Sequence, residues 1–389
     1  MGTPERVPVV VFVQRAVLEY RAAFYEQLRE VLADRGIRLE LVRSGPRSGY
    51  ARADEVALTW MVDRPALSLR FRGRELLWQR PGSQARAADL VIVEQAARLP
   101  SNVALLLRPG GPAVALWGHG RSFETAARRS RLGEWAKRRL YPAPNWWFAY
   151  NQLAAEAVLG LGFPVERLTV VDNSTDTRRL RQRMAEVSPE RVAALRRLHD
   201  LGEGPIALFL GNLSSRKRLD YLLAASDCLA ASVEGFRLVI VGDGEQRAAV
   251  RDSAGERDHV RLLGHRSGEA LADVLAASSV LLVPAWAGLV VVDSFAAGVP
   301  LCASRSMDHP PEISYIEDGV NGLLIDDGGE PGRYAAAVAE VLREAGLYER
   351  LVAGCAVAAA HYTVEGMVER FADGIQRALG QDPRGRPLT

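Results

Sequence analysis

The fold is decided by Pro205-Ile-Ala-Leu-Phe-Leu-Gly211, an apolar strand that opens into the basic turn Asn212-Leu-Ser-Ser-Arg-Lys217. The pattern returns at Ser279-Val-Leu-Leu-Val-Pro284, which leads through Gly288 into an apolar helix predicted over Leu289–Ala297. In such strand-to-helix turns, backbone N–H groups and a helix N-terminus can face an anionic ligand. Two of these turns in one Rossmann-like domain point to a phosphate-bearing small molecule.

Short apolar runs alternate with helical patterns along the rest of the chain. A helix is predicted over Tyr20–Arg35, and the pattern from 331 to about 380 is helical. Strands are predicted at 9–13, 37–42, 90–93, 113–117, 146–150, 168–171, 205–210, 237–241, 259–263, 279–283 and 299–303. This alternation predicts an α/β fold in which helices cover both faces of parallel sheets.

A chain of 389 residues is expected to form two domains. The polar turn 172–177 and the charged stretch after it mark the predicted junction. We predict a Rossmann-like domain over 1–175, a second one over 176–365, and a C-terminal helix and tail over 366–389 that pack back on the first domain. Two doubly wound domains would place their strand ends around a central cleft, where such folds bind ligands.

The net charge of +2 conceals a basic first half, with 29 basic and 18 acidic side chains in residues 1–184. This excess suggests an acidic acceptor, an anionic surface, or arginine-rich helices that face water. Segment 121–139 holds seven basic and two acidic residues. Peripheral contact with an anionic membrane and a simple solvated helix explain it equally well. There is no basic platform interleaved with aromatic residues, so we expect no nucleic-acid partner.

Cysteine usage and hydropathy bear on the compartment. The chain has three cysteines, Cys228, Cys302 and Cys355, each among apolar neighbours in the sequence. Their spacing does not match a metal site, so we expect no structural zinc. Free thiols predict a reducing compartment, the cytoplasm. The start of the chain has no signal-peptide pattern. The uncharged run 274–292 is long enough to span a bilayer, but Pro284 and Gly288 interrupt it where a strand–loop–helix arrangement requires, so we predict no spanning segment.

Lysine is rare in this chain, since only Lys137 and Lys217 occur among 49 basic side chains. Lys217 follows a strand end within a few residues, where a flexible ammonium can follow the oxygens of a diphosphate. The alternative is an exposed residue at a helix start, and Lys137 shows that such lysines occur. We favour the binding role because of the position after the strand.

The second turn offers a different set of groups. Gly288 leaves room for close approach, and the N–H groups of Leu289 and Val290 begin a helix whose positive end favours anions. Asp293, one turn further, can accept hydrogen bonds from ribose hydroxyls. A carboxylate that interacts only with the helix dipole and solvent is the structural alternative.

These segments resemble glycosyltransferase family 4, whose members have the GT-B fold. The resemblance rests on 211–220, on Val241-Gly-Asp-Gly244 and on 284–300, and it continues at Glu312 and Asn321-Gly322. In the first half, Tyr20-Arg21-Ala-Ala-Phe24 and Trp117-Gly-His119-Gly120 look like the same family. The resemblance covers most of residues 9–375 and is strongest over 205–325.

The resemblance implies retaining transfer of a hexose from a nucleotide-diphosphate sugar to a hydroxyl acceptor, without a metal or another cofactor. The first domain would bind the acceptor (a glycan, a lipid-linked sugar or a natural-product glycoside), and the second the nucleotide sugar. Lys217 would neutralise the diphosphate, and His119 would lie near the reacting sugar. The other implied binding residues are Gly211, Asn212, Arg216, Gly264, His265, Gly288, Leu289, Val290 and Asp293.

The chain departs from the family pattern at two places. The paired glutamates, eight positions apart in the family, are here Ala285 and Asp293, and the arginine that often follows the first glycine is Asn212, with Arg216 nearby to substitute. Two other functions therefore remain open. One is a nucleotide-sugar epimerase of GT-B fold, which would need no acceptor, and the other is a non-catalytic glycosyltransferase-like partner protein.

Overall fold

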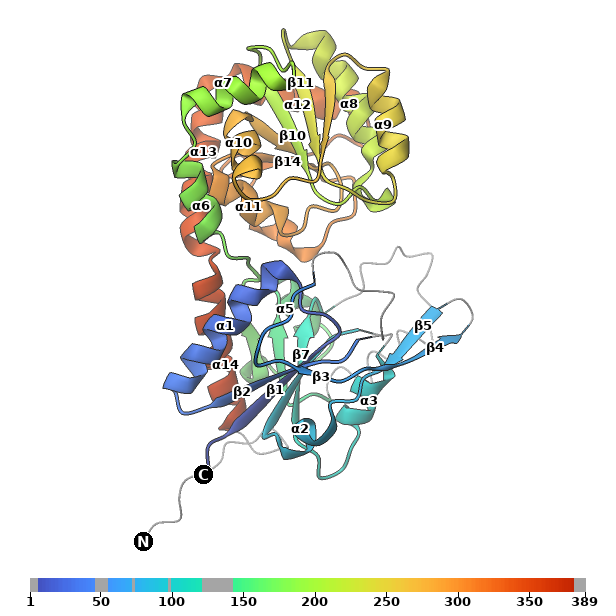
Figure 1. Ribbon diagram of the computed structural model, residues 1–389, viewed down its shortest axis with the longest axis vertical. Helices are drawn as coiled ribbons and strands as arrows, with labels where there is room; N and C mark the ends of the chain where they lie inside the picture. Colours follow the sequence, from blue (N-terminus) through green and yellow to red (C-terminus); the bar gives the residue numbers. More distant parts are fainter. Residues whose placement is uncertain (1–5, 46–54, 72–73, 97–98, 121–142, 381–389) are drawn as a thin grey trace. The chain divides into compact units, whose positions relative to one another are not determined.

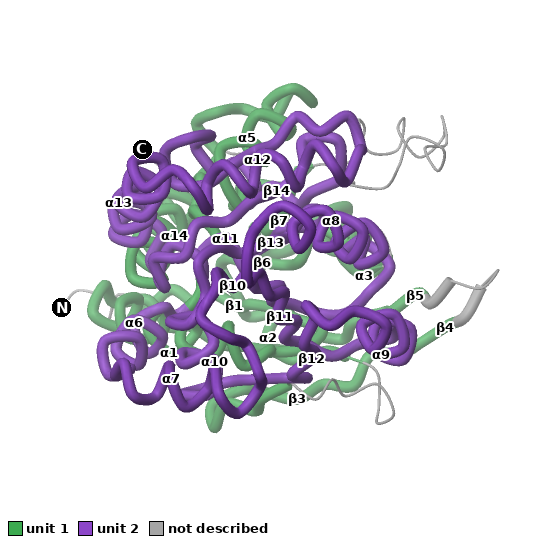
Figure 2. The backbone as a smooth tube through the Cα atoms, turned by 90° about the horizontal axis from the view of Figure 1, so that it is seen from above, with its two compact units in different colours: residues 1–175, 364–389 green, residues 176–363 purple. Residues whose placement is uncertain are grey.

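The structure is a computed structural model that describes residues 6–45, 55–71, 74–96, 99–120 and 143–380. It divides into two compact units, drawn in different colours in Figure 2. The first comprises residues 1–175 together with 364–389, and the second comprises residues 176–363. The final helix therefore belongs to the unit that begins the chain.

The first unit is built on a parallel sheet in the order β3-β2-β1-β6-β7-β8-β9 (Figure 1). Its strands are β1 (Val9–Gln14), β2 (Arg38–Arg43), β3 (Val62–Asp63), β6 (Leu90–Glu94), β7 (Ala113–Gly118), β8 (Trp146–Ala149) and β9 (Leu168–Val170). An antiparallel hairpin, β4 (Leu67–Phe71) and β5 (Arg74–Trp78), follows β3. The helices are α1 (Glu19–Asp34), α2 (Gly82–Ala87), α3 (Pro100–Leu106), α5 (Gln152–Leu159) and α14 (Val364–Leu379), with a 3₁₀ turn at Val165–Arg167.

Both faces of this sheet are buried, because successive side chains of a strand point to opposite sides. Phe12 lies on the face that packs against α1 and α14, and Val11 and Val13 lie on the face that packs against α2 and α5. Phe371 of α14 stacks on Phe148 with ring centroids 4.5 Å apart. Trp146 and Trp147 are fully buried on opposite faces of the sheet, so both are core residues.

The second unit has a parallel sheet in the order β12-β11-β10-β13-β14-β15. Its strands are β10 (Ile206–Leu210), β11 (Arg237–Val241), β12 (Val260–Gly264), β13 (Val280–Leu282), β14 (Leu301–Ser304) and β15 (Gly322–Ile325). The helices are α6 (Arg178–Ala185), α7 (Pro189–Leu198), α8 (Leu219–Ser232), α9 (Arg247–Gly255), α10 (Gly268–Ala277), α11 (Val290–Ala297), α12 (Pro331–Arg343) and α13 (Ala345–His361), with 3₁₀ turns at Ser215–Lys217 and Pro311–Tyr315.

The strand order of the second unit reverses at β10. The chain goes from β10 outwards to β11 and β12, and then returns to the other side of β10 to form β13, β14 and β15. In an open parallel sheet, ligands bind outside the carboxyl ends of the strands at such a switch point. The turns that follow β10 and β13 lie at this place, and they are the two turns with which the sequence analysis began.

The doubly wound α/β prediction is confirmed in both units, and the predicted strands agree with β1, β2 and β6–β14 to within about two residues. The run 274–292 comprises the end of α10, strand β13 and the start of α11, so its interpretation as interrupted secondary structure is also confirmed. Cys302 and Cys355 are buried, whereas Cys228 is exposed on α8, so its apolar sequence neighbours do not enclose it. Neighbours in sequence do not share a face of a helix.

One described segment, Ala345–Leu379, is long and apolar enough to cross a membrane by length and composition. It consists of α13 and α14. Leu351 and Cys355 of α13, and Met367, Phe371 and Ile375 of α14, are fully buried within their units. Both helices therefore behave as core helices.

Candidate functional site

The basic turn after β10 is shaped by two glycines. Gly211 has φ +152°, and a Cβ there would lie 3.4 Å from Lys217 Nζ. Gly242, which follows β11, has φ +153°, and a Cβ there would lie 1.8 Å from the Gly211 carbonyl oxygen. Only glycine fits either position. The close approach brings the ends of β10 and β11 together and leaves space for the amine of Lys217 over Gly211.

Lys217 lies at the end of the 3₁₀ turn with 8% of its surface exposed. Its Nζ donates a hydrogen bond of 2.8 Å to the carbonyl oxygen of Trp286, in the turn after β13. Burial lowers the pKa of the amine from 10.5 to about 8, so it is still charged at neutral pH. The lysine thus joins the two turns, and the alternative of an exposed helix-start residue is wrong.

The second turn presents the N-terminus of α11. The first helical hydrogen bonds run from Val291 N–H to Gly288 and from Val292 N–H to Leu289, at 3.0 and 2.9 Å. Within the described part of the chain, no acceptor is recorded for the N–H groups of Leu289 and Val290. Two donors and the positive end of the helix dipole are therefore available to an anion. Asp293 is half-buried one turn further along.

The loop between Pro284 and Gly288 is held in an unusual conformation. Trp286 has φ +55°, a left-handed value that is rare and costly for a bulky residue. Its N–H donates to the Asp308 carbonyl at 2.9 Å, and the Arg216 guanidinium lies 4.7 Å above its ring. This strained residue therefore supplies the carbonyl that binds Lys217 and the aromatic face that carries Arg216.

His309 stabilises the loop between Pro284 and Gly288 through two hydrogen bonds. Its Nδ1 accepts the Ala287 N–H at 3.1 Å, and its Nε2–H donates to the Ser304 carbonyl at 2.8 Å. Burial lowers the pKa of the ring, which keeps it neutral and able to accept at Nδ1. The sequence analysis missed the roles of both Trp286 and His309. Trp286 lies within 284–300 and His309 lies three residues before Glu312, so both are in or beside segments that carry the family resemblance, but neither role can be inferred from sequence alone.

The remaining predicted residues of this unit lie around the same sheet edge. Asn212 and Arg216 are exposed in the basic turn. Gly264 ends β12 and accepts the Gly242 N–H at 3.0 Å, and His265 beside it is exposed. The structure thus brings Arg216 and Lys217 into contact with the turn after β13, with Gly211 close to Lys217. It places Gly264 and His265 two strands away from β10 at the same edge.

His119 belongs to the first unit, directly after β7. Its ring centroid lies 4.2 Å from that of Tyr150. Burial, followed by the positive charge of Arg21, lowers the pKa of His119 to about 4, so the ring is neutral at pH 7. Arg21 is itself buried, lies over the Trp117 ring and donates to the Ser174 carbonyl at 3.0 Å. The segments that resembled the family in the first half therefore meet at one edge of that sheet.

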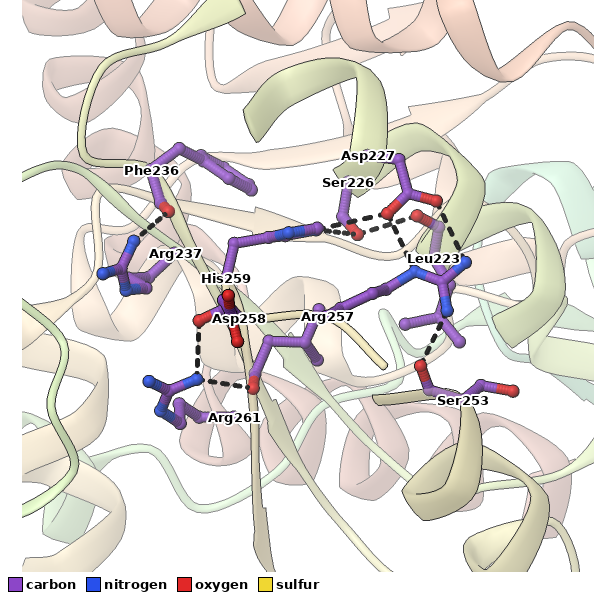
Figure 3. Close-up of polar contacts among 11 residues, drawn as sticks. Leu223, Ser226, Asp227, Phe236, Arg237, Ser253, Arg257, Asp258, His259 and Arg261 are labelled. Carbon is purple, nitrogen blue, oxygen red and sulfur yellow. Dashed lines mark hydrogen bonds and ion pairs between the residues drawn. The ribbon is translucent and has the colours of Figure 1, made fainter. Parts of the chain in front are cut away.

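A serine, a histidine and an aspartate also cluster at the opposite end of the second sheet, before β12 (Figure 3). Ser226 Oγ and Asp227 Oδ1 approach the same nitrogen, His259 Nε2, at 3.0 and 3.5 Å. A catalytic triad requires them on different ring nitrogens. The hydroxyl of Ser226 donates to the Leu223 carbonyl, and Asp227 also accepts two hydrogen bonds from Arg257. This cluster ties α8 to the start of β12.

Residues 204–344, which include both turns, match the family described as Glycosyl transferases group 1. The match covers most of the second unit and includes the segments that carry the resemblance recognised in the sequence, so that recognition is confirmed. Among the described residues of the whole chain, no group of histidine, cysteine or acidic side chains could hold a metal ion.

Curated relatives are similar to this chain over part of their length. The GDP-mannose-dependent alpha-(1-6)-phosphatidylinositol monomannoside mannosyltransferase of Mycobacterium tuberculosis is 32% identical over 192 residues, which are 46% of this chain and 48% of that protein. The D-inositol 3-phosphate glycosyltransferase of Acidothermus cellulolyticus is 31% identical over 201 residues, or 47% and 44% of the two chains. The chain thus spans about half the length of the curated relatives it matches.

Solved structures are similar along nearly the whole chain. Anabaena HepE in complex with UDP-glucose has a TM-score of 0.67 at 16% identity and covers 95% of this chain and 99% of its own. A glycosyltransferase from Rickettsia africae has a TM-score of 0.68 at 11% identity, with coverages of 97% and 100%. At these identities the likeness shows the fold alone, and it confirms the GT-B prediction for this chain.

Proposed function

We propose that this protein is a retaining hexosyltransferase that moves a sugar from a nucleotide-diphosphate sugar to a hydroxyl acceptor, without a metal ion or another cofactor. The observation that carries the proposal is the Lys217 ammonium. It is buried, still charged at pH 7, and held 2.8 Å from a carbonyl in the turn that leads to the open amides of α11. An ammonium and a helix N-terminus together favour a diphosphate.

The chemistry requires stabilisation of the leaving group. When the sugar–phosphate bond breaks, negative charge grows on the diphosphate and a cation-like centre forms at the sugar, so prearranged positive groups near the phosphate lower the barrier. Lys217, the Leu289 and Val290 amides and Arg216 would supply this charge. The departing phosphate would take the acceptor proton on the same face of the sugar, and the neutral His119 ring would position the sugar or the acceptor.

The two units would divide the substrates. We assign nucleotide-sugar binding to 176–365 and acceptor binding to 1–175, completed by 366–389. Asp293 would accept hydrogen bonds from the ribose, and the main chain at Gly264–His265 would contact the base. Relatives named for GDP-mannose and a neighbour solved with UDP-glucose support a nucleotide-sugar donor without deciding the base. Acceptors named for relatives include a phosphatidylinositol mannoside and an inositol phosphate.

We place the protein in the cytoplasm, where two buried free thiols are stable. Peripheral contact with the inner membrane face through the basic segment 121–139 remains part of the proposal. That segment lies outside the described residues.

Isothermal titration with UDP, GDP and dTDP tests the donor site. At least one nucleotide should bind, and Lys217→Ala should weaken it, whereas Arg251→Ala, at an exposed arginine of the same unit, should not. If none of the three binds, the proposal is wrong. Asp293→Asn should weaken nucleotides more than bare pyrophosphate, and an equal loss for both would contradict the ribose role.

Ala285 favours a second candidate, a non-catalytic glycosyltransferase-like partner. The side chain at this position is a buried methyl group rather than a carboxylate. A protein that binds nucleotide but shows neither transfer nor donor hydrolysis across a panel of nucleotide sugars would be such a partner, and Ala285→Glu should then create activity. Conversion of the donor in the absence of any acceptor would instead identify an epimerase.

A further inference from the structure

The β4–β5 hairpin of the first unit exposes an apolar face. Leu67 pairs directly with Trp78, and Leu69 pairs with Leu76, so these four side chains share one side of the ribbon. Leu67, Leu69 and Trp78 are 58%, 65% and 46% exposed. Among the described residues they are three of the ten large hydrophobic side chains that are exposed, and they lie together rather than singly. A contiguous exposed apolar patch marks an interaction surface.

The other side of the hairpin explains why the ribbon keeps this orientation. Leu77, one residue before Trp78, is 4% exposed and packs in a small cluster with Ala66 and Leu99. This cluster anchors the hairpin to its own unit, so the apolar face is directed outward by packing. Figures 1 and 2 both show the ribbon extending beyond β3 and α3 at the margin of the unit.

The sequence of the hairpin and its flanks is mostly basic. Residues 64–80 contain five arginines and a single acid, Glu75. Arg64 and Arg80, which flank the two strands, are exposed. Arginine can lie along an apolar surface with its guanidinium at the level of phosphates, and tryptophan prefers the boundary between apolar and aqueous layers. The patch therefore combines an apolar centre with a basic margin.

We propose that this hairpin face, formed by Leu67, Leu69, Leu76 and Trp78 and flanked by Arg64 and Arg80, docks on an anionic lipid bilayer. Leucine and tryptophan enter the interface, and the arginines contact lipid phosphates. The basic margin is complementary to anionic lipid headgroups. A second copy of the chain is a less suitable partner, because the two basic margins would repel each other. The inference is separate from sugar transfer, since it concerns where the protein resides and not what it catalyses.

Co-sedimentation of the full chain with large vesicles tests the proposal. The protein should bind vesicles of phosphatidylcholine and phosphatidylglycerol in equal parts, bind phosphatidylcholine alone more weakly, and dissociate as salt is raised. The double variant Leu67→Ser/Leu69→Ser should bind about tenfold more weakly or worse, because it removes two large apolar groups from the interface. Leu107→Ser is the matched control, since Leu107 is 61% exposed in the same unit but outside the hairpin, and it should bind like the parent protein.

The double variant changes two exposed positions, so we expect it to keep the fold of the parent protein. Circular dichroism and an unchanged nucleotide titration test that it does. Equal vesicle binding by parent and double variant would overturn the proposal, as would no binding to the anionic vesicles. A parent protein that dimerises in solution while the double variant does not would assign this face to a second copy and would also overturn it.

Discussion

Lys217 determines how donor binding should depend on pH. Its folded-state pKa of about 8 lies below the ordinary 10.5, so the amine begins to lose its charge in the free protein at mildly alkaline pH. A bound diphosphate favours the charged form. The association constant for UDP or GDP should therefore fall as pH rises from 7.5 to 9.5, by up to about tenfold per pH unit above the pKa. Titration calorimetry measures this, and Lys217→Ala should show a flat profile; parallel profiles for both proteins would contradict the role.

His309 should link loop conformation to donor affinity. His309→Phe leaves the buried Ala287 N–H without its acceptor, which costs about 1–3 kcal/mol of unfolding free energy. The loop that supplies the Trp286 carbonyl to Lys217 would also loosen, so nucleotide affinity should fall. His309→Asn keeps an oxygen acceptor and should recover part of both losses. Urea unfolding and calorimetry give the two readouts, and a variant that loses stability but keeps full affinity would make His309 purely structural.

At the scale of elements, the N-terminus of α11 can be tested one amide at a time. Leu289 has φ −60°, which proline adopts without strain, so Leu289→Pro removes one N–H donor while the helix still starts. A hydrogen bond to a charged phosphate contributes about 1.5–3 kcal/mol, so UDP affinity should fall by roughly 10- to 100-fold. Leu289→Ala is the matched control, because it loses the side chain and keeps the N–H. Equal affinities of the two variants would place the phosphate elsewhere.

The elements also show what the sequence could predict. Runs such as Val9–Val13 and Leu238–Val241 are apolar at every position because parallel strands are buried on both faces, and this pattern is legible without a structure. Strand β15 and the two-residue β3 were not predicted, and β3 is too short to produce a pattern. Hairpin β4–β5 was also missed, although Leu67-Ser-Leu-Arg-Phe71 alternates apolar and polar residues. That alternation predicts a buried apolar face, whereas Leu67 and Leu69 are exposed.

Within the site, residue type and position were enough to single out Lys217, which is buried against the second turn, while its binding role stays a prediction. A lysine in an arginine-rich chain, placed directly after a strand, pointed to Lys217 without coordinates. The left-handed φ of Trp286 was unpredictable, since tryptophan disfavours it and contacts from Lys217, Arg216 and the Asp308 segment hold it. His309 forms hydrogen bonds with Ala287, 22 residues earlier, and with Ser304, 5 residues earlier. No local sequence pattern predicts these contacts.

For the whole molecule, buried histidines should make stability sensitive to acid. Burial lowers the pKa of His119, His199, His259 and His309 below the unfolded value. A depressed histidine pKa leaves stability intact above about pH 6.5 and reduces it as pH falls towards the folded value. His119, at about 4, should alone account for about 2–3 kcal/mol between pH 6.5 and 4.5. Calorimetric unfolding of His119→Gln should show a shallower decline, and a decline as steep as that of the parent protein would contradict the assignment.

The placement of α14 has a consequence for biosynthesis. Residues 176–363 separate this helix from the sheet it covers, and Phe371 completes the aromatic core around Phe12, Phe24 and Phe148. A ribosome therefore releases every residue of the second unit before the first can close its core. The half of the protein that is translated first therefore cannot finish folding until the last helix has been made, and the part of its sheet that α14 covers stays exposed to chaperones in the interval.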